Sequence, residues 1–264
     1  MNELEGKIAI VNGAGSGIGA GIAQALAEEG MKVAVADVDA DAGRDVAKRI
    51  QEEGAQAEAF ACDVSSRESV ERLAANVGKK WGPPAIVCNN AGTFVGGPTL
   101  AATEADWRWL IDVNLLGVVH GASVFAPLML EAGEGHIVNT ASVGGFLPYS
   151  GMAVYCATKA AVVSFSESLR QELEAKGIGV STLCPGSVAT NLAESDRLRP
   201  SDLGPAGGSS AILGNGLDDG MAPVEVGRHV VTGIRANAKL IFTHAEFKAA
   251  FEERFQEILA DFSA

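Results

Sequence analysis

Ser142, Tyr155 and Lys159 have the types and spacing needed to hold and move a proton. Tyr155 and Lys159 are four residues apart in a stretch with helical periodicity, which puts a phenol and an ammonium on one face of a helix. Ser142 comes 13 residues before Tyr155 and directly follows an apolar run that predicts a strand. Taken singly, each residue has an ordinary alternative. Ser142 could be a strand-end hydroxyl, Tyr155 an aromatic on the helix surface and Lys159 a solvated charge. Taken together, they predict acid–base chemistry.

A glycine-rich turn near the N-terminus has the pattern of a dinucleotide-binding turn. The segment NGAGSGIG, residues 12–19, follows the first apolar run and opens an amphipathic stretch. Glycines there let the backbone turn sharply and approach a pyrophosphate, which the N-terminus of the next helix stabilises. Asp37 ends the second apolar run, 24 residues after Gly13. A carboxylate about 20 residues after such a turn is expected to bind the adenosine ribose.

Asp37 also predicts the choice of cofactor. A carboxylate accepts hydrogen bonds from both ribose hydroxyls and repels the 2′-phosphate of NADP. No Arg or Lys stands beside it in the sequence, since Val38 and Asp39 follow, and Ser16 inside the turn is uncharged. We therefore predict NAD rather than NADP. The alternative is that Asp37 is a solvated loop carboxylate or a helix cap.

Short apolar runs alternate with longer amphipathic stretches along the whole chain. The runs that predict strands are Lys7–Val11, Lys32–Ala36, Gln56–Ala61, Ala85–Asn89, His136–Ala141, Val180–Leu183 and Leu240–Phe242. The stretches that predict helices are Ser16–Glu29, Asp39–Glu53, Ser65–Trp81, Thr103–Glu131, Val154–Lys176, Ala222–Ala236 and Ala245–Phe262. Asp39 is placed to cap the second helix, and Thr103 opens the fourth with a Thr-x-x-Asp variant of the capping box.

This alternation predicts an α/β fold. Strands that are nearly all apolar indicate a parallel sheet covered on both faces, and so a single doubly wound Rossmann-type domain over residues 1–264. The one irregular segment, about residues 187–221, is rich in Gly, Ser, Asp and Pro. We expect it to be a lid or substrate-binding loop inserted in the domain. The alternative is a disordered insertion.

Charge and hydropathy exclude several classes of protein. The 264 residues are 47% hydrophobic and 20% charged, which is typical of a globular chain. With 20 Lys and Arg against 33 Asp and Glu, the net charge of −13 repels phosphate backbones, so we expect no nucleic-acid partner. No run of about 18 apolar residues is present, and residues 1–7 lack an apolar signal segment, so we expect no membrane partner.

The cysteines and histidines do not predict a metal site. The spacing of the cysteines fits neither a zinc ligand pair nor a small disulfide scaffold, and the histidines show no paired ligand spacing. We expect the thiols to be reduced core residues in a cytoplasmic protein. A serine hydrolase is not expected either, because no Gly-x-Ser-x-Gly elbow follows a strand with Asp and His downstream. The cysteines are Cys62, Cys88, Cys156 and Cys184.

Together these features resemble the short-chain dehydrogenase/reductase family over nearly the whole chain. A Tyr-x-x-x-Lys pair alone is common, but here the other family motifs accompany it in the family's order and spacing. Those motifs are Gly13, Gly17 and Gly19 of the turn, Asp63, Asn89-Asn90-Ala91-Gly92, Asn114, Ser142, Tyr155, Lys159 and Pro185-Gly186. One departure is Asn12, where many members have Thr. Both side chains can hydrogen-bond to a neighbouring strand, so we expect a structural substitution.

The resemblance implies that NAD lies along the carboxyl edge of the sheet. Asp63 and Val64 would contact the adenine, and Val188 and Thr190 the nicotinamide carboxamide. The alternative for Asp63 is a strand-end cap before Ser65. The full set of cofactor-binding residues that the resemblance implies is Gly13, Ser16, Gly17, Ile18, Gly19, Asp37, Asp63, Val64, Asn89, Ala91, Gly92, Tyr155, Lys159, Pro185, Gly186, Val188 and Thr190.

The reaction implied by the resemblance is hydride transfer between a secondary alcohol and NAD, giving the ketone, without a metal. Tyr155 would take the proton, Ser142 would hold the substrate oxygen, Lys159 would bind the nicotinamide ribose, and Asn114 would hold a water that links Lys159 to solvent. A free phenol has a pKa of about 10. We expect the Lys159 ammonium and the positive nicotinamide to lower the pKa of Tyr155.

The substrate is expected among loops at residues 93–98, 143–152 and 187–221. Their mostly apolar side chains favour a bulky, apolar or aromatic secondary alcohol or ketone, with loop packing as the alternative for any one of them. Residues 191–200 also resemble the matching segment of Cα-dehydrogenases of lignin-derived β-aryl ethers. Arg197 and Arg199 there are expected to be solvated, or else to meet an anionic substrate group. The candidate wall residues are Phe94, Val95, Phe146, Leu147, Tyr149, Met152, Leu192, Leu198 and Leu203.

Two rival functions share part of this pattern. An epimerase or dehydratase of the same fold would use the same residues for transient hydride chemistry. A non-catalytic dinucleotide-binding sensor would keep the glycine turn and Asp37 but would have no need for the Ser142, Tyr155 and Lys159 set.

The resemblance further implies a homotetramer, or a dimer. Its contacts would run through the predicted helices at Thr103–Glu131 and Val154–Lys176 and the strand Leu240–Phe242. Apolar residues on these elements exceed what one sheet face needs. They are Val118, Val119, Phe125, Val162, Val163, Phe165 and Leu169.

Overall fold

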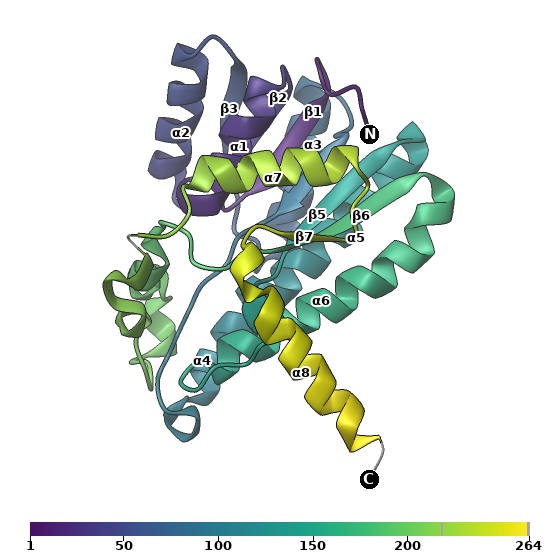
Figure 1. Ribbon diagram of the computed structural model, residues 1–264. Coiled ribbons are helices and arrows are strands. Elements are labelled where there is room, and N and C mark those ends of the chain that lie inside the picture. Colours follow the sequence, from purple (N-terminus) through teal and green to yellow (C-terminus); the bar gives the residue numbers. More distant parts are fainter. Residues whose placement is uncertain (218, 263–264) are drawn as a thin grey trace.

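A seven-stranded parallel sheet forms the centre of the protein in the computed structural model, which describes residues 1–217 and 219–262 (Figure 1). The strand order is β3-β2-β1-β4-β5-β6-β7, so successive crossovers change direction between β1 and β4. Each predicted strand is confirmed with small shifts at its ends. The strands are β1 (Ile8–Asn12), β2 (Lys32–Asp37), β3 (Gln56–Ala61), β4 (Ile86–Asn89), β5 (Gly135–Thr140), β6 (Ile178–Cys184) and β7 (Leu240–Phe242).

Helices cover both faces of the sheet, which confirms the doubly wound α/β fold. Figure 1 shows α7 crossing the near face beside α1, while α8 projects away from the body toward the C-terminus. The helices are α1 (Gly17–Glu28), α2 (Ala40–Glu52), α3 (Arg67–Lys80), α4 (Glu104–Leu110), α5 (Gly117–Ala132), α6 (Ala153–Leu173), α7 (Pro223–Arg235) and α8 (Lys248–Asp261).

The core has two layers because alternate residues of each strand point to opposite faces. Val11 of β1 packs in one layer with Ile22 of α1. Its neighbour Ile10 packs in the other layer with Leu73 of α3 and Phe125 of α5. All five side chains are buried. Burying each of these side chains stabilises the folded state by about 1.5–3 kcal/mol, which explains why nearly every strand residue is apolar.

Two helix starts follow the predicted capping chemistry. The Asp39 carboxylate accepts a hydrogen bond from the Ala42 backbone N–H at 3.1 Å at the start of α2. At the start of α4, the Thr103 hydroxyl accepts from the Asp106 N–H at 3.1 Å, and the Asp106 carboxylate accepts from the Thr103 N–H at 2.8 Å. The Thr-x-x-Asp capping box is therefore confirmed.

The helix predicted at Thr103–Glu131 contains a π-helical turn. This turn, η2 (Ile111–Leu116), separates α4 from α5. By length and composition alone, the run Glu104–Ala132 would be able to cross a membrane. Its side chains Val118, Phe125 and Met129 are instead buried, with Phe125 and Met129 in the core layer under the sheet, so this run is a core helix. π-Turns occur most often at functional sites, and this one carries Asn114.

The irregular segment after β6 is built from short 3₁₀ helices: η5 (Asn191–Leu198), η6 (Ser201–Leu203) and η7 (Ser210–Leu217). The Asp196 carboxylate ties η5 to the start of η7, because it accepts hydrogen bonds from the Ser209 hydroxyl at 2.7 Å and the Ser210 N–H at 3.1 Å. The part of the segment that the structure describes is therefore folded, in contrast to the alternative of a disordered insertion.

The cysteines are free and buried, as the sequence predicted. Cys88 lies in β4, Cys184 ends β6 and Cys156 lies in α6. Burial raises the pKa of the Cys88 and Cys184 thiols to about 12 and that of Cys62 to about 11. These thiols therefore stay protonated and unreactive at neutral pH.

Candidate active site

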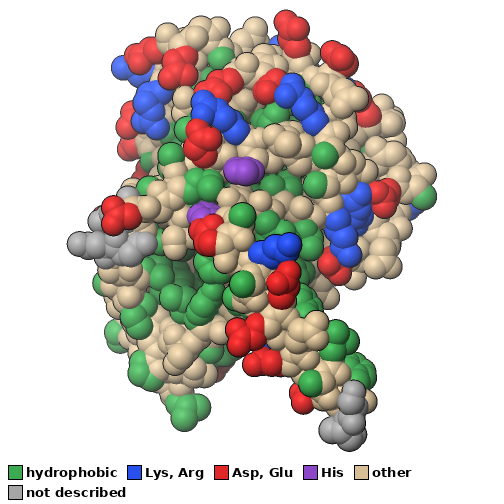
Figure 2. Space-filling model, viewed as in Figure 1, with side chains coloured by type: hydrophobic (Ala, Val, Ile, Leu, Met, Phe, Trp, Pro, Cys, Tyr) green, Lys and Arg blue, Asp and Glu red, His purple; other side chains and the backbone are tan. Residues whose placement is uncertain are grey.

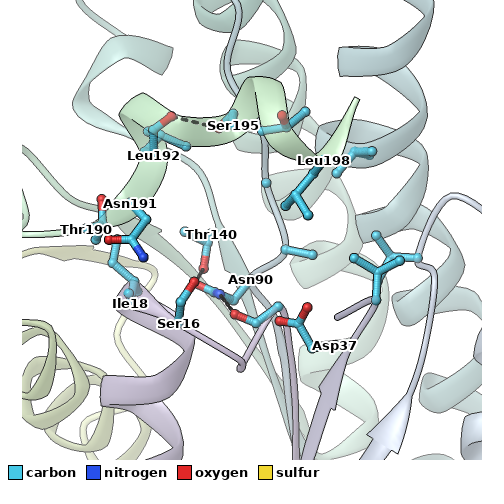
Figure 3. Close-up of a pocket in the computed structure, with 18 of the residues that line it drawn as sticks. Ser16, Ile18, Asp37, Asn90, Thr140, Thr190, Asn191, Leu192, Ser195 and Leu198 are labelled. Atoms are coloured by element: carbon cyan, nitrogen blue, oxygen red, sulfur yellow. Dashed lines mark hydrogen bonds between the residues drawn. The ribbon is translucent and has the colours of Figure 1, made fainter. Parts of the chain in front are cut away.

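A cleft of about 440 Å³ runs along the carboxyl ends of the strands. Open parallel sheets bind ligands at this edge, where the strand order reverses. Figure 3 shows the two sides of the cleft: Ser16 and Asp37 lie on the sheet side, and Leu192, Ser195 and Leu198 of η5 lie across from them.

The glycine turn at the end of β1 needs its glycines. Gly13 and Gly17 have φ of +63° and +51°, which other residues rarely adopt. A Cβ on Gly13 would lie 2.5 Å from Ala91 Cα, and one on Gly19 would lie 2.1 Å from the Gly13 carbonyl oxygen. A Cβ on Gly17 would lie 2.9 Å from Thr190 Cγ2, so the loop after β6 packs directly on the turn. This close packing leaves a backbone cradle at the N-terminus of α1.

Asp37 ends β2 at the edge of the cleft. Its carboxylate accepts hydrogen bonds from the Gly15 N–H at 2.7 Å and the Asp39 N–H at 2.9 Å, which fix its orientation. Arg197 of η5 also lines the cleft, and its Nη1 lies 3.6 Å from Asp39 Oδ2. A loop far away in the sequence thus reaches the end of the cleft where Asp37 and Asp39 lie.

Most of the predicted cofactor residues line this cleft, and three predicted site residues do not. Gly19 and Asn89 are buried beneath it, and Asn114 is buried behind it. The predicted residues that line it are Gly13, Ser16, Gly17, Ile18, Asp37, Asp63, Val64, Ala91, Gly92, Ser142, Tyr155, Lys159, Pro185, Gly186, Val188 and Thr190.

Asn89 belongs to a ladder of amides across the sheet, so its expected place in the cleft is wrong. Its Oδ1 accepts from Asn12 Nδ2 at 3.1 Å, and its Nδ2 donates to Asn139 Oδ1 at 2.9 Å. Asn139 in turn donates to the Ser166 hydroxyl at 2.9 Å. Asn90 takes the place in the cleft instead, and its N–H donates to Asn12 Oδ1 at 2.8 Å. As expected, Asn12 hydrogen-bonds to the neighbouring strand and the loop after it.

The predicted catalytic side chains converge on one wall of the cleft. Ser142 follows β5, and its hydroxyl accepts from the Gly144 N–H at 3.1 Å. A Cβ on Gly144 would lie 3.5 Å from Ser142 Oγ and 3.9 Å from Tyr155 Cε1, so both side chains meet at this glycine. Lys159, one turn along α6, has its Nζ 5.6 Å from the centroid of the Tyr155 ring.

The expected fall in the pKa of Tyr155 is not found in the protein by itself. Burial raises the pKa of Tyr155 to about 12, even though its hydrogen bond with Ser142 lowers it. The Phe94 ring packs against the phenol ring edge-on, with centroids 5.1 Å apart, which keeps water from this side. Burial disfavours the phenolate more strongly than the Ser142 hydrogen bond favours it, and a lowering of this pKa by the positive nicotinamide stays a prediction.

Lys159 is buried with a single backbone partner. Its Nζ donates to the Thr140 carbonyl at 2.9 Å. Burial lowers the pKa of Lys159 to about 8, so the ammonium remains the main form at pH 7. A Cβ on Gly92 would lie 3.4 Å from Lys159 Nζ and 3.5 Å from Asn114 Oδ1, so both groups lie next to the Gly92 Cα.

Asn114 holds the loop after β4 against α6. Its Oδ1 accepts from the Thr93 N–H at 2.8 Å, and its Nδ2 donates to the Thr93 carbonyl at 3.0 Å. The same Nδ2 reaches the Thr158 hydroxyl, one residue before Lys159, at 3.2 Å. The π-turn gives the side chain this inward position. A water held by Asn114 stays a prediction.

The predicted substrate wall is correct for only part of its residues. Leu192, Leu198 and Leu203 line the cleft. The others do not: Phe94, Val95 and Leu147 are buried, Phe146 packs on Phe242 and Phe251, Tyr149 is 40% exposed, and Met152 lies outside the lining. The apolar pattern could not separate loop packing from cavity lining.

Several cleft residues were not singled out from the sequence. Asn90 was visible only as part of the Asn89-Asn90-Ala91-Gly92 motif. The others lie on elements whose distance from the cleft depends on chain folding, and no local pattern marks them. They include Trp109, Asp112, Thr140, Ser195 and Pro200.

His244, also not anticipated, holds the loop that follows β6. Its Nδ1 accepts a hydrogen bond from the Gly186 N–H at 3.1 Å, which makes Nε2 the protonated nitrogen, and Nε2–H donates to the Ser187 carbonyl at 2.8 Å. A Cβ on Gly186 would lie 2.6 Å from the Phe247 ring. The C-terminal segment thus fixes the backbone on one side of the cleft.

Comparison with known proteins agrees with this site. Residues 7–200 match the family model of the short chain dehydrogenases. The chain is 35% identical to a C alpha-dehydrogenase from Sphingobium sp. (strain NBRC 103272 / SYK-6), over 98% of this chain and 87% of that protein. It is 38% identical to a putative ketoacyl reductase from Streptomyces coelicolor, over 87% of each chain.

Among solved structures, a short chain dehydrogenase/reductase from Burkholderia phymatum in complex with NAD superposes with a TM-score of 0.95. It is 36% identical to this chain, and the match covers 99% of this chain and 97% of that one. The family model covers the glycine turn, Asp37 and the Ser142, Tyr155 and Lys159 set. The chain therefore belongs to the short-chain dehydrogenase/reductase family, and it is an oxidoreductase of that family.

Proposed function

We propose that the protein is an NAD-dependent dehydrogenase that oxidises a bulky, apolar or aromatic secondary alcohol to the ketone, or runs the reverse reaction. The observation that carries this proposal is the meeting of Ser142 and Tyr155 at Gly144, in the same cleft as the glycine turn and Asp37. The NAD-bound relative of the same fold supports the choice of cofactor class.

The residues present fit a dinucleotide. The backbone cradle at Gly13 and Gly17 admits no Cβ, which is what close approach of a pyrophosphate requires. The Asp37 carboxylate is held at the ribose end, and Lys159 and Thr190 lie at the other end of the cleft. When bound, NAD⁺ supplies the hydride acceptor and a positive charge beside the phenol.

The catalytic roles follow from the positions of this chain's own groups. Ser142 Oγ holds the substrate oxygen beside the Tyr155 hydroxyl, and Tyr155 takes the hydroxyl proton in oxidation or gives it back in reduction. Lys159 would bind the nicotinamide ribose, and its ammonium keeps a positive charge near the phenol. Asn114, which hydrogen-bonds to Thr93, would hold a water between Lys159 and solvent.

The substrate class follows from the cleft wall opposite the sheet. Trp109, Leu192, Leu198 and Leu203 supply apolar surface there, which favours an aryl or other bulky alcohol. The similarity to the Sphingobium C alpha-dehydrogenase supports the same class.

We expect a panel of aromatic and alicyclic secondary alcohols to release NADH from NAD, followed as absorbance at constant pH. With NADP in place of NAD, the same alcohols should be oxidised with a kcat/KM for the cofactor at least about tenfold lower, because Asp37 repels the 2′-phosphate. Stoichiometric NADH release also separates this function from an epimerase or dehydratase, whose hydride returns to the substrate. A protein that binds NAD but oxidises no alcohol would instead be a sensor.

Two matched variants test the part played by Asp37. Asp37→Ala should raise the KM for NAD by about 10- to 100-fold, because it removes hydrogen bonds to a charged acceptor. Asp41→Ala, on the exposed first turn of α2, is the control and should leave that KM unchanged. Equal effects of both variants, or a wild-type preference for NADP, would contradict the assignment.

We also propose that residues 1–264 form a single domain, with residues 187–221 as the substrate loop. We further propose that the protein works in the cytoplasm. The free, buried cysteines support a reducing compartment.

A homotetramer, or a dimer, is our proposal for the assembly. Figure 2 shows apolar side chains exposed along the projecting helix α8, where Phe255 and Leu259 are 48% and 58% exposed. Phe262, directly after α8, is 85% exposed. Exposed apolar surface of this kind is typical of an interface between subunits. We expect light scattering at micromolar concentration to give the mass of four chains. A monomer in that measurement would refute the proposal.

A further inference from the structure

A buried ion pair outside the cleft fixes the loop that forms its far wall. Arg199, between η5 and η6, has its Nη1 2.8 Å from Asp106 Oδ1 in α4. Their side chains are 8% and 0% exposed. The Arg108–Glu104 pair on the same helix is 64% and 86% exposed, and exposed pairs of this kind add little stability. The expectation that Arg199 is a solvated charge is therefore wrong.

The Asp106 carboxylate joins three parts of the chain. Its Oδ2 accepts from the Thr103 N–H at 2.8 Å and from the Gly207 N–H at 3.0 Å, while Oδ1 faces Arg199. A Cβ on Gly207 would lie 2.0 Å from the Ala101 carbonyl oxygen, so the loop presses directly on the segment before α4. Burial alone would raise the pKa of Asp106, but these hydrogen bonds and Arg199 hold it below its usual value.

The guanidinium of Arg199 lies over the Trp109 ring. Its central carbon lies 5.4 Å from the centroid of the Trp109 ring, and its Nε donates to the Gly204 carbonyl at 2.9 Å. Trp109 lines the cleft and packs in one cluster with Tyr155 and Leu203. The arginine is thus connected to the catalytic side of the cleft through the indole ring.

Leu198 and Pro200, the two neighbours of Arg199 in the sequence, line the cleft, while Arg199 itself does not. Figure 3 shows Leu198 on the η5 side, across the cleft from Ser16. Leu198 is 40% exposed. Its position depends on the backbone that Arg199 anchors.

We propose that Arg199 is a positioning residue for the substrate: through Asp106 and Trp109 it fixes the wall formed by Leu198 and Pro200, and so sets the affinity for bulky alcohols. This inference rests on the proposed dehydrogenase function. An alcohol too small to reach the wall does not depend on it, and neither does the cofactor end of the cleft.

The test compares Arg199→Met with Arg108→Met, which removes an exposed arginine from α4, the helix that carries Asp106. With a 1-aryl-1-propanol as substrate, Arg199→Met should raise KM about tenfold or more, because a wall displaced by about 1 Å misplaces the substrate. Its KM for 2-propanol and for NAD should change less than about twofold. Arg108→Met should leave all three constants at wild-type values.

Two further variants separate positioning from folding. Asp106→Asn combined with Arg199→Met leaves no unpaired buried charge, so it should keep the wild-type Tm but still show the raised KM for the aryl alcohol. Arg199→Lys keeps the charge but loses the guanidinium over the Trp109 ring, and it should recover part of the affinity. A double variant with wild-type KM would overturn the proposal.

Amide hydrogen exchange provides a readout that needs no activity. Backbone amides in residues 191–209 should exchange faster in Arg199→Met than in Arg108→Met, with the sheet unchanged. If the wild type oxidises no alcohol but this difference in exchange appears, the proposed dehydrogenase function is wrong, while the role of Arg199 in holding the loop is supported. If the wild type is active, and exchange or the KM for the aryl alcohol is unchanged in Arg199→Met, the positioning role is wrong.

Discussion

Replacing Tyr155 by phenylalanine is expected to lower kcat for alcohol oxidation by about 10³-fold while the affinity for NAD stays near that of the wild type. We propose that the phenol hydroxyl beside Ser142 exchanges a proton with the substrate, and phenylalanine keeps the ring that packs against Phe94. The change therefore removes the acid–base group with little change in packing. NADH absorbance measures the turnover, and a fluorescence titration measures NAD binding.

The chain provides a matched control, because Tyr149 is its only other tyrosine. Tyr149 is 40% exposed and lies outside the cleft lining, so Tyr149→Phe should keep wild-type kcat. If Tyr155→Phe retains more than about a tenth of the wild-type kcat, Tyr155 is not the acid–base group.

The raised pKa of Tyr155 gives this reaction a pH dependence with a definite sign. Oxidation needs the phenolate, and burial holds the pKa at about 12 in the protein by itself, so the oxidation rate should rise with pH above neutrality. Reduction needs the phenol and should not rise. Tyr155→Phe should lose the rise along with the activity.

Gly19→Ala is expected to lower the affinity for NAD by at least about 100-fold and to lower Tm as well. The added methyl would lie 2.1 Å from the Gly13 carbonyl oxygen and 2.6 Å from Asn90 Nδ2. Neither neighbour can move freely, because Gly13 lies against Ala91 and Asn90 is hydrogen-bonded to Asn12. The turn must therefore open, and the cradle for the pyrophosphate is lost.

Gly78→Ala is the control for this substitution. Gly78 lies in α3, and a Cβ there would meet nothing within 4 Å. Alanine should stabilise the helix by up to about 1 kcal/mol and leave NAD binding unchanged. Calorimetry and NAD titration of the two variants provide the comparison. Tight NAD binding by Gly19→Ala would mean that the turn does not hold the pyrophosphate.

The sequence was sufficient to predict the features that depend on residues close to one another in the chain. The apolar runs predicted the strands because a strand buried on both faces has few polar positions. Asp39 and the Thr103–Asp106 pair predicted helix starts because a cap acts within three residues of itself. The glycine turn and the Tyr155–Lys159 pair were visible for the same reason: their spacing alone places them on one turn or one helix face.

Interactions between distant segments were decided only by the tertiary structure. Arg199 could pair with Asp106, 93 positions earlier in the chain, only after the loop had folded onto α4. Asn89 went into an amide ladder rather than the cleft because the register of neighbouring strands places Asn12 and Asn139 beside it. The burial that raises the pKa of Tyr155 to about 12 is likewise a result of packing between elements. Spacing along a chain fixes which groups share a turn, but burial and long-range pairing depend on how whole elements pack.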